Sequence, residues 1–228
     1  MLIACEHAGC NVPQRWGRLG LDEAFFGTHY SHDLGAGQVA DMLASLLDAS
    51  VVNAVYSRLF YDINRQISDW QCIRSDMGGI PVPGNLGLSP KERLLRDRIC
   101  REPFDNAVFA HLRRSDILIG IHSFSPIYDG FARETEIGVM RHEDCPIGET
   151  LLRALRGKKE FLIGDNDPYD LRQVPPGSAS RIQRQQPVPA VLIEIRNDLL
   201  SDKAGVVAVS NALAAAIVSL GFLDPELP

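Results

Sequence analysis

Short apolar segments alternate with helical patterns along this chain, and this alternation constrains its fold more than any other feature. The apolar segments are four to six residues long and rich in β-branched side chains, as is typical of buried strands. They occupy residues 2–5, 51–56, 116–121, 136–140 and 190–195. Because strands that alternate with helices form a sheet covered by those helices, the sequence predicts an α/β fold.

Two segments between the predicted strands carry clear helical signals. Residues 36–48 place apolar side chains at helical spacing. A second helix is predicted after Ser89, an N-cap residue type, with a proline at the first helical position and Glu92 in place to complete a capping box. We expect this helix to run to about residue 114 and to break or kink at Pro103.

The bulk composition bounds the class of protein. A length of 228 residues fits one large domain or two small ones, and we predict a single domain over residues 1–228. Hydrophobic residues make up 45% and charged residues 23%, which is ordinary for a soluble globular protein. The net charge of −6 argues against nucleic-acid binding through a basic surface.

Cysteine usage and the two ends of the sequence bear on location. The five cysteines show no CxxC spacing, and the N-terminal residues lack a basic region followed by a long apolar stretch, so we expect reduced thiols in a cytoplasmic protein. The uncharged segment between Lys203 and Asp224 approaches the length of a membrane span. Its larger apolar side chains recur at helical spacing among many alanines, so we predict a helix packed on the sheet.

Two segments rich in glycine and proline are predicted to be loops. They cover residues 76–90 and 164–189. The second is longer than a passive connection usually is. Long segments of this kind in a compact domain are often lids or binding loops, so we expect a functional role for it.

Ionisable side chains stand at the ends of four predicted strands. Glu6 and His7 follow the first strand, and Arg58 follows the second. His122 follows the third strand, and Glu194 lies at the end of the last. A lone histidine at a strand end is more often structural than catalytic. Because ligands of open α/β sheets collect at the carboxyl ends of the strands, we nevertheless expect this combination to form a site.

The two histidines suggest a metal ion. A catalytic zinc site takes three protein ligands and leaves one position for water. His7 and His122 supply two ligands, and Asp33 is a candidate for the third, with His32 and Glu6 as alternatives. Asp33 also stands close enough to the first predicted helix to be its N-cap instead. The remaining histidines have no supporting context and are expected at the surface or in packing: His29, His111 and His142.

A base and a carboxylate clamp complete the candidate chemistry. Glu194 ends an apolar strand, where partial desolvation raises the pKa of a carboxylate and suits a general base; the alternative is a structural ion pair with Arg196. Arg58 and Arg65 bracket the segment "SRLFYDINR". Arginine is suited to bidentate carboxylate binding, so we favour a clamp for a substrate carboxylate over surface ion pairing.

Five motifs together give the sequence a family resemblance. They are "EHAGCNVP", "SHDLGA", "SRLFYDINR", "GIHSFSP" and "VLIEIRNDL", in this order, from residue 6 to about residue 199. With these motifs the sequence resembles the N-formylglutamate amidohydrolase family. The resemblance implies a fold similar to zinc carboxypeptidases and aspartoacylases, with a mixed, mostly parallel sheet flanked by helices.

The resemblance also implies roles for individual residues. One zinc ion per chain would be held by the ligand set His7, Asp33 and His122, and Glu194 would act as the base. By position, Arg58 would help to polarise the scissile carbonyl. The pair Asn64 and Arg65 would hold the substrate carboxylate.

The sequence departs from the family pattern at one position near the second histidine. Typical members have an aspartate two residues before it, and this chain has Gly120. Such an aspartate would orient the histidine, so another group must do this here. Residues 130–189 match the family only vaguely, and a second substrate carboxylate has three weaker candidate partners: Arg196, Tyr169 and Arg181.

The sequence therefore predicts a zinc-dependent amidohydrolase. We expect it to cleave the amide of a small N-acyl amino acid, such as N-formylglutamate, with zinc-activated water. The expected partner is a small carboxylate-bearing substrate, without nucleic acid or membrane. A peptidase or deacylase with the same mechanism is one alternative, and a non-catalytic relative that binds carboxylates is another.

Overall fold

The computed structural model describes residues 1–142 and 145–221, and its centre is one sheet. The strand order is β2 (Ser50–Asn53), β1 (Leu2–Cys5), β5 (Leu118–Phe124), β10 (Ala190–Arg196), β8 (Ile137–Met140) and β9 (Ile163–Asp165). The first four of these strands are mutually parallel, whereas β8 runs antiparallel to β10 and parallel to β9. The predicted mixed, mostly parallel sheet is confirmed.

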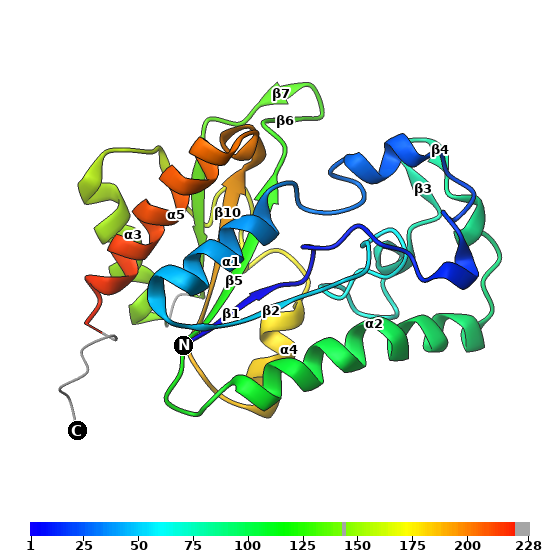
Figure 1. Cartoon of the computed structure of the whole chain (residues 1–228), viewed down its shortest axis with the longest axis horizontal. Coiled ribbons are helices and arrows are strands. Elements are labelled where there is room, and N and C mark those ends of the chain that lie inside the picture. The colour runs from blue at the N-terminus through cyan, green and yellow to red at the C-terminus, as the bar shows by residue number, and fades with distance from the viewer. Residues whose placement is uncertain (143–144, 222–228) are drawn as a thin grey trace.

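Helices cover both faces of this sheet (Figure 1). One face carries α1 (Ala36–Leu47), α3 (Pro146–Lys158) and α5 (Lys203–Val218). The opposite face carries α2 (Pro90–His111) and α4 (Ser178–Gln185). Short 3-10 helices occupy Gln14–Trp16, Glu23–Gly27, Trp70–Ile73, Pro83–Asn85 and Asn197–Leu200.

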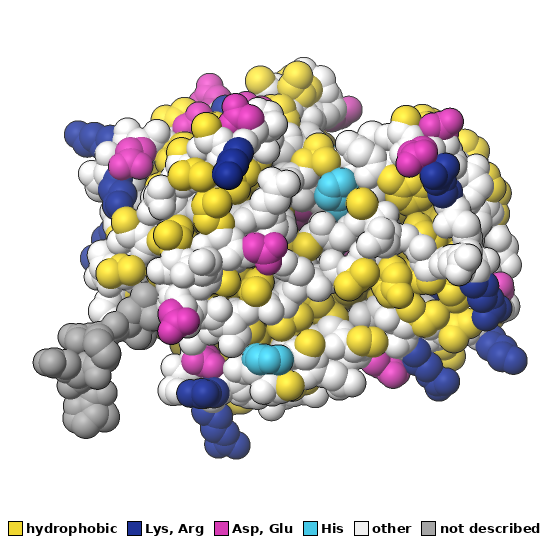
Figure 2. Space-filling view, in the orientation of Figure 1, with side chains coloured by type: hydrophobic (Ala, Val, Ile, Leu, Met, Phe, Trp, Pro, Cys, Tyr) yellow, Lys and Arg dark blue, Asp and Glu magenta, His cyan; other side chains and the backbone are white. Residues whose placement is uncertain are grey.

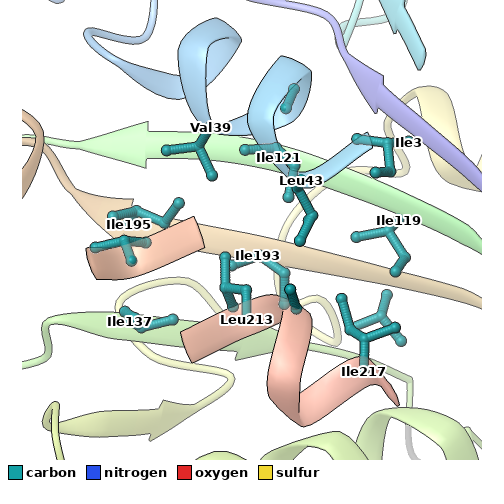
Figure 3. Close-up of a cluster of buried hydrophobic side chains, with 14 of the residues drawn as sticks. Ile3, Val39, Leu43, Ile119, Ile121, Ile137, Ile193, Ile195, Leu213 and Ile217 are labelled. Carbon is teal, nitrogen blue, oxygen red and sulfur yellow. The ribbon is translucent and has the colours of Figure 1, made fainter. Parts of the chain in front are cut away.

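Alternation along the strands divides the core into two layers. Ile119 and Ile121 of β5, and Ile193 and Ile195 of β10, point toward the face that carries α1 and α5 (Figure 3). Helix α5 meets them with apolar side chains on the stripe that the sequence predicted, such as Leu213, which is fully buried. The intervening strand residues point the other way, and this second face holds the polar side chains of the site described below.

Helix α2 begins as predicted but passes through its proline. The Ser89 hydroxyl accepts a hydrogen bond from the backbone N–H of Glu92, and the Glu92 carboxylate accepts one from the N–H of Ser89, which is a complete capping box. Of the two expectations for Pro103, a break is excluded, because one helix continues to His111. Phe104 and Val108 bury its inner side against the sheet, and this packing offsets the backbone hydrogen bond that a proline cannot donate.

Two predicted strands differ from those observed. The strand expected over residues 51–56 ends at Asn53. The strand expected over 116–121 begins two residues later and continues to Phe124, so that His122 lies inside β5 and not after it. The ladder with β10 holds this extension, since Glu194 pairs with His122 and Arg196 with Phe124.

Several short elements escaped the sequence analysis. The segment 76–90 contains a two-stranded hairpin, β3 (Asp76–Met77) and β4 (Ile80–Pro81), and the segment 164–189 contains the end of β9 and all of α4. A second hairpin joins β6 (Ile127–Tyr128) to β7 (Phe131–Ala132). Its turn residues Asp129 and Gly130 both have positive φ, the backbone that an Asp-Gly pair adopts in a two-residue hairpin loop.

The remaining bulk expectations concern thiols, membranes and charge. All five cysteines are free. Within the described ranges, each helix is too short or too polar to cross a membrane, and the part of the 203–224 segment beyond residue 221 lies outside them. On the face drawn in Figure 2, lysine and arginine side chains lie apart from one another, most of them near the edge of the molecule, and form no continuous basic patch.

Candidate metal centre and active site

The candidate site lies at the carboxyl ends of β1, β5 and β10, as the strand-end analysis predicted. His7 follows β1, while His122 and Glu194 are partners in the ladder between β5 and β10. The two histidine rings meet edge to face, with centroids 5.1 Å apart. Both histidines are buried, with only 3% of each exposed. The sheet therefore brings together three residues that are widely separated in sequence.

Asp33 completes this group from the loop before α1. Its Oδ2 atom lies 3.3 Å from Nδ1 of His7 and 3.0 Å from Nδ1 of His122, and it accepts a hydrogen bond from the backbone N–H of Ser123 (3.2 Å). The backbone N–H of Asp33 donates to the carbonyl of His7, which fixes the loop against β1. The N-cap alternative is wrong, because Gly35 is the N-cap of α1.

The donor set of these three side chains fits a metal ion. One ligand atom from each of His7, Asp33 and His122 can be chosen so that all three lie within 4.8 Å of one another. Two ligands of a tetrahedral zinc ion, each at about 2.1 Å, lie about 3.4 Å apart, close to the nitrogen–oxygen separations around Asp33. Of the alternative third ligands, Glu6 faces the opposite nitrogen of His122, and no contact of His32 with this group is observed among the described residues.

A carboxylate also faces the outer nitrogen of each histidine. Nε2 of His7 lies 2.7 Å from Oδ1 of Asp62, and Nε2 of His122 lies 3.2 Å from Oε2 of Glu6. Asp62 accepts the proton of Nε2 of His7, which fixes the tautomer of this ring and leaves the lone pair of Nδ1 toward the metal, whereas Glu6 and His122 form an ion pair without hydrogen-bond geometry. Sequence analysis assigned no role to Asp62, although it stands in the same motif as Asn64 and Arg65.

Glu6 accounts for the missing aspartate at position 120. A Cβ atom at Gly120 would lie 3.9 Å from Nε2 of His122, so a side chain there would point at this nitrogen, but it would also lie 2.4 Å from Cδ2 of Leu192. Leu192 fills that space, and Glu6 reaches the same nitrogen from the neighbouring strand. The other oxygen of Glu6 accepts a short hydrogen bond from the Ser178 hydroxyl at the start of α4.

Electrostatics stabilise the charged forms of these groups. Burial lowers the pKa of His7 and His122, but the surrounding carboxylates outweigh it and leave both pKa values raised, that of His122 strongly. Burial raises the pKa of Glu6 and Asp33, yet the nearby histidines bring the pKa of Glu6 down to about 2 and hold that of Asp33 well below its usual range. A metal requires the neutral ring, so its binding must displace protons here.

Glu194 differs from the other carboxylates of the site. Burial raises its pKa to about 7, against the charge of His122, which lowers it. Its Oε2 atom, like Oε2 of Glu6, is buried without a hydrogen-bond partner among residues 1–142 and 145–221. The predicted alternative, an ion pair with Arg196, is wrong, because the Arg196 guanidinium donates to Asp198 and lies 3.3 Å from Glu136. A desolvated carboxylate of this kind can take up a proton near neutral pH.

Arg58 bridges two acids of the site. Its guanidinium donates to Asp33 (3.0 Å) and to Asp62 (3.1 Å) with 22% of the side chain exposed. One of these acids lies between the histidines and the other holds His7. Two of its five N–H donors are thereby used, and the others remain for a ligand.

Asn64 and Arg65 lie at the edge of the same site. Oδ1 of Asn64 accepts a hydrogen bond from the backbone N–H of Ser178 (2.9 Å), which leaves its amide NH2 group as a donor. Arg65 is half-buried, and its guanidinium has no hydrogen bond or ion pair with the residues that the structure describes. Helix α4, which sequence analysis read as part of a loop, thus orients one of the predicted substrate-binding residues.

The weaker candidates for a second carboxylate are placed differently from one another. Arg181 pairs with Asp105 of α2 (2.8 Å). Arg196 is occupied by Glu136, Asp198 and two backbone carbonyls. The hydroxyl of Tyr169 accepts a hydrogen bond from Arg133 (3.3 Å), and burial followed by the charge of Glu194 raises its pKa. The charge of the candidate base thus acts on Tyr169.

The histidines without sequence context lie in different places, one near the site and one at the surface. His29 lies 3.7 Å from Oδ1 of Asp33, and burial lowers its pKa to about 4. No motif around His29 indicated this position. His111 is exposed and contacts the carbonyl of Ala107 (2.8 Å).

The comparison with protein families settles the class of the chain. The model of the N-formylglutamate amidohydrolase family matches residues 1–201. The chain belongs to this family. The resemblance found in the five motifs is thus confirmed, and membership makes the protein a hydrolase that acts on amide bonds. The buried group of two histidines and one aspartate gives this family member a candidate metal site.

One solved structure shows the same fold. The gene product Atu2144 from Agrobacterium tumefaciens is 29% identical, covers 96% of this chain and 91% of its own, and has a TM-score of 0.86. Two other structures are more distant. The CwlD amidase from Clostridioides difficile is 12% identical over 98% of each chain, with a TM-score of 0.46. A metallo-carboxypeptidase from Burkholderia cenocepacia is 14% identical over 98% of this chain and 57% of its own, with a TM-score of 0.42. A search of the curated proteins finds no match.

Proposed function

We propose that the protein is a zinc-dependent amidohydrolase that cleaves a small N-acyl amino acid, with N-formylglutamate as the first candidate. One observation carries this proposal: the His7, Asp33 and His122 group lies beside Glu194, whose buried carboxylate has a raised pKa. This is the combination of metal ligands and base that amide hydrolysis by water requires. The family match supports the amide class of substrate.

His7, Asp33 and His122 would hold the metal. A zinc ion bound there supplies a Lewis acid that lowers the pKa of water and polarises a carbonyl group. Asp62 and Glu6 keep the two imidazoles oriented, each from its outer nitrogen. Burial excludes bulk water from these ligands, which strengthens every charge interaction among them.

Glu194 and Arg58 act on the reacting groups. Glu194 accepts a proton from the attacking water and returns it to the nitrogen of the leaving amine as the C–N bond breaks. Arg58 donates to the carbonyl oxygen, where negative charge develops in the transition state. The products are the carboxylic acid and the free amino acid, so that one water is consumed for each amide cleaved.

Asn64 and Arg65 hold the α-carboxylate of the substrate. Arg65 offers a guanidinium fork without a described protein partner, and Asn64 offers an amide NH2 group fixed by Ser178. Loss of a charged grip of this kind typically costs about 2–5 kcal/mol. Because both residues lie in the motif that also supplies Arg58 and Asp62, one segment sets the distance between the bound carboxylate and the scissile amide.

Metal content and hydrolysis test the proposal together. We would measure zinc by elemental analysis in the native protein, in Asp33→Ala and His122→Ala, and in the control His111→Ala, which removes an exposed histidine. The expected result is about one zinc per chain in the native protein and the control, and none in the other two variants. Only the two proteins that contain zinc are expected to hydrolyse N-formylglutamate. A native protein that takes up no added zinc would refute the proposal.

A further inference from the structure

Arg133 lies in a cluster of aromatic rings next to the candidate site. Its guanidinium carbon is 4.6 Å from the ring centre of Tyr128, 5.2 Å from that of Tyr169 and 5.3 Å from that of Phe124. Its Nη1 atom donates to the Tyr169 hydroxyl (3.3 Å) and to the carbonyl of Ser125 (3.5 Å). The ring contacts are cation–π interactions, which hold a cation without neutralising it.

No carboxylate forms an ion pair with Arg133 in the described part of the chain. Arg181 and Arg196, the two arginines that sequence analysis considered for a second substrate carboxylate, both have acidic partners. Arg133 therefore keeps its full charge available at this end of the site. A half-buried cation with aromatic walls and no acidic partner is suited to bind an anion from outside the protein.

The position of Arg133 is tied to the catalytic strands. Phe124, which supplies one of the rings around Arg133, lies two residues after His122 in β5. The backbone carbonyl of Arg133 accepts a hydrogen bond (3.1 Å) from Arg196, which lies two residues after Glu194 in β10. Its backbone N–H donates to the carbonyl of Pro126 (2.8 Å), which closes the β6–β7 hairpin. These bonds fix Arg133 at the same carboxyl end of the sheet as the base.

We infer that Arg133, with Tyr169, binds the side-chain carboxylate of the substrate and makes the enzyme selective for N-acyl derivatives of acidic amino acids. The inference rests on the proposed function, because it assigns a second subsite to the same reaction. In this arrangement Asn64 and Arg65 hold the α-carboxylate and Arg133 holds the side-chain carboxylate, with the scissile amide between them. Neutral N-acyl amino acids lack the second contact.

The neighbouring cavity gives access from solvent but does not itself select an anion. It has a volume of about 530 Å³, and its lining includes Arg133, Tyr128, Tyr169 and the acids Asp129 and Asp167. The Asp167 carboxylate accepts a hydrogen bond from the Thr135 hydroxyl, and Asp129 is exposed at the hairpin turn. Because two acids and one arginine line the cavity, the lining has no excess of positive charge, and selection of an anion depends on direct contact with the guanidinium.

Two substrates that differ only in charge test this role. We would compare the kcat/KM for N-formylglutamate and N-formylglutamine in the native enzyme, in Arg133→Gln and in the control Arg114→Gln. Arg114 is exposed between α2 and β5, at the opposite end of β5 from His122. A lost charge-assisted hydrogen bond corresponds to a decrease of about 10- to 100-fold. We expect this decrease in kcat/KM only for N-formylglutamate and only in Arg133→Gln, and we expect it to arise mainly from a higher KM.

The outcomes separate this inference from the proposed function. An equal loss on both substrates, or no loss on either, would overturn the role of Arg133 and leave the amidohydrolase proposal standing. If the native protein hydrolyses neither substrate, that proposal fails, and calorimetric binding of glutarate and butyrate still decides the subsite. Tighter binding of glutarate that disappears in Arg133→Gln would support the subsite, whereas equal binding of the two acids would refute it.

Discussion

Replacing Glu6 with glutamine tests how His122 is held toward the metal. Glutamine keeps the shape of the side chain and removes its charge. The contact between Oε2 of Glu6 and Nε2 of His122 is 3.2 Å long, and both side chains are almost fully buried, at 2% and 3% exposed, so solvent screens it little. We therefore expect the variant to fold and to bind zinc more weakly.

The size of the effect follows from the type of contact. The contact is a buried ion pair without hydrogen-bond geometry, so the value for a hydrogen bond to a charged group, about 1.5–3 kcal/mol or about 10- to 150-fold in affinity, is an upper range. Outer partners of metal-binding histidines typically contribute about 10- to 100-fold. With Gly120 unable to supply a carboxylate, no other described group faces this nitrogen, so we expect the loss to fall within the second range.

The assay is competition for zinc with a chromophoric chelator at neutral pH. Two controls isolate the contact: Ser178→Ala removes the other hydrogen bond of Glu6 but leaves His122 untouched, and Glu134→Gln removes an exposed carboxylate. Thermal melting of the metal-free proteins checks that each variant folds. Affinity for zinc in Glu6→Gln within about twofold of the native value would refute the argument, and an equal loss in Ser178→Ala would assign the effect to α4 instead.

Two further predictions concern the base and the core. Glu194→Gln is expected to retain zinc but to lose about 10²- to 10⁴-fold in kcat. The pKa of Glu194 is raised to about 7, and a base must be ionised to accept a proton, so native activity should fall as the pH decreases below about 7. A pH profile of kcat/KM would reveal this fall. Activity that stays constant down to pH values near the ordinary carboxyl pKa would contradict this role. Leu213→Ala removes a fully buried side chain between α5 and the sheet and should lower the free energy of unfolding by about 2–5 kcal/mol in urea, whereas loss of the exposed Leu94 side chain by Leu94→Ala should change it little.

The sequence predicted most of the sheet because its signals are local. The apolar segments of β1, β8 and β10 end within one residue of the expected positions. Helix α4 could not be predicted in this way, because it has only eight residues and its position depends on contacts with distant segments. Its Ile182 is buried in the core layer that α2 also lines, and its Ser178 contacts Glu6 and Asn64.

The candidate site was predictable where strand ends marked it. His7, His122 and Glu194 could be proposed because polar residues directly after or within apolar strands stand out. The choice between Asp33, His32 and Glu6 could not be made from the residue pattern, since a loop residue carries no periodic signal, and Asp33 came from the family resemblance. Arg133 escaped notice for the same reason, because its environment comes from rings contributed by three separate segments.

The pairing of His122 with Glu194 across β5 and β10 has a consequence for how this enzyme can diverge. The spacing between a candidate metal ligand and the candidate base is set by backbone hydrogen bonds of the central ladder. A single inserted residue in either strand would turn one of these side chains into the apolar layer under α1 and α5, so the chain would lose its fold and its chemistry together. The hairpin around Asp129 and the segment before α4 lie outside that ladder. Changes of substrate can therefore accumulate in those two segments, while the reaction itself stays fixed.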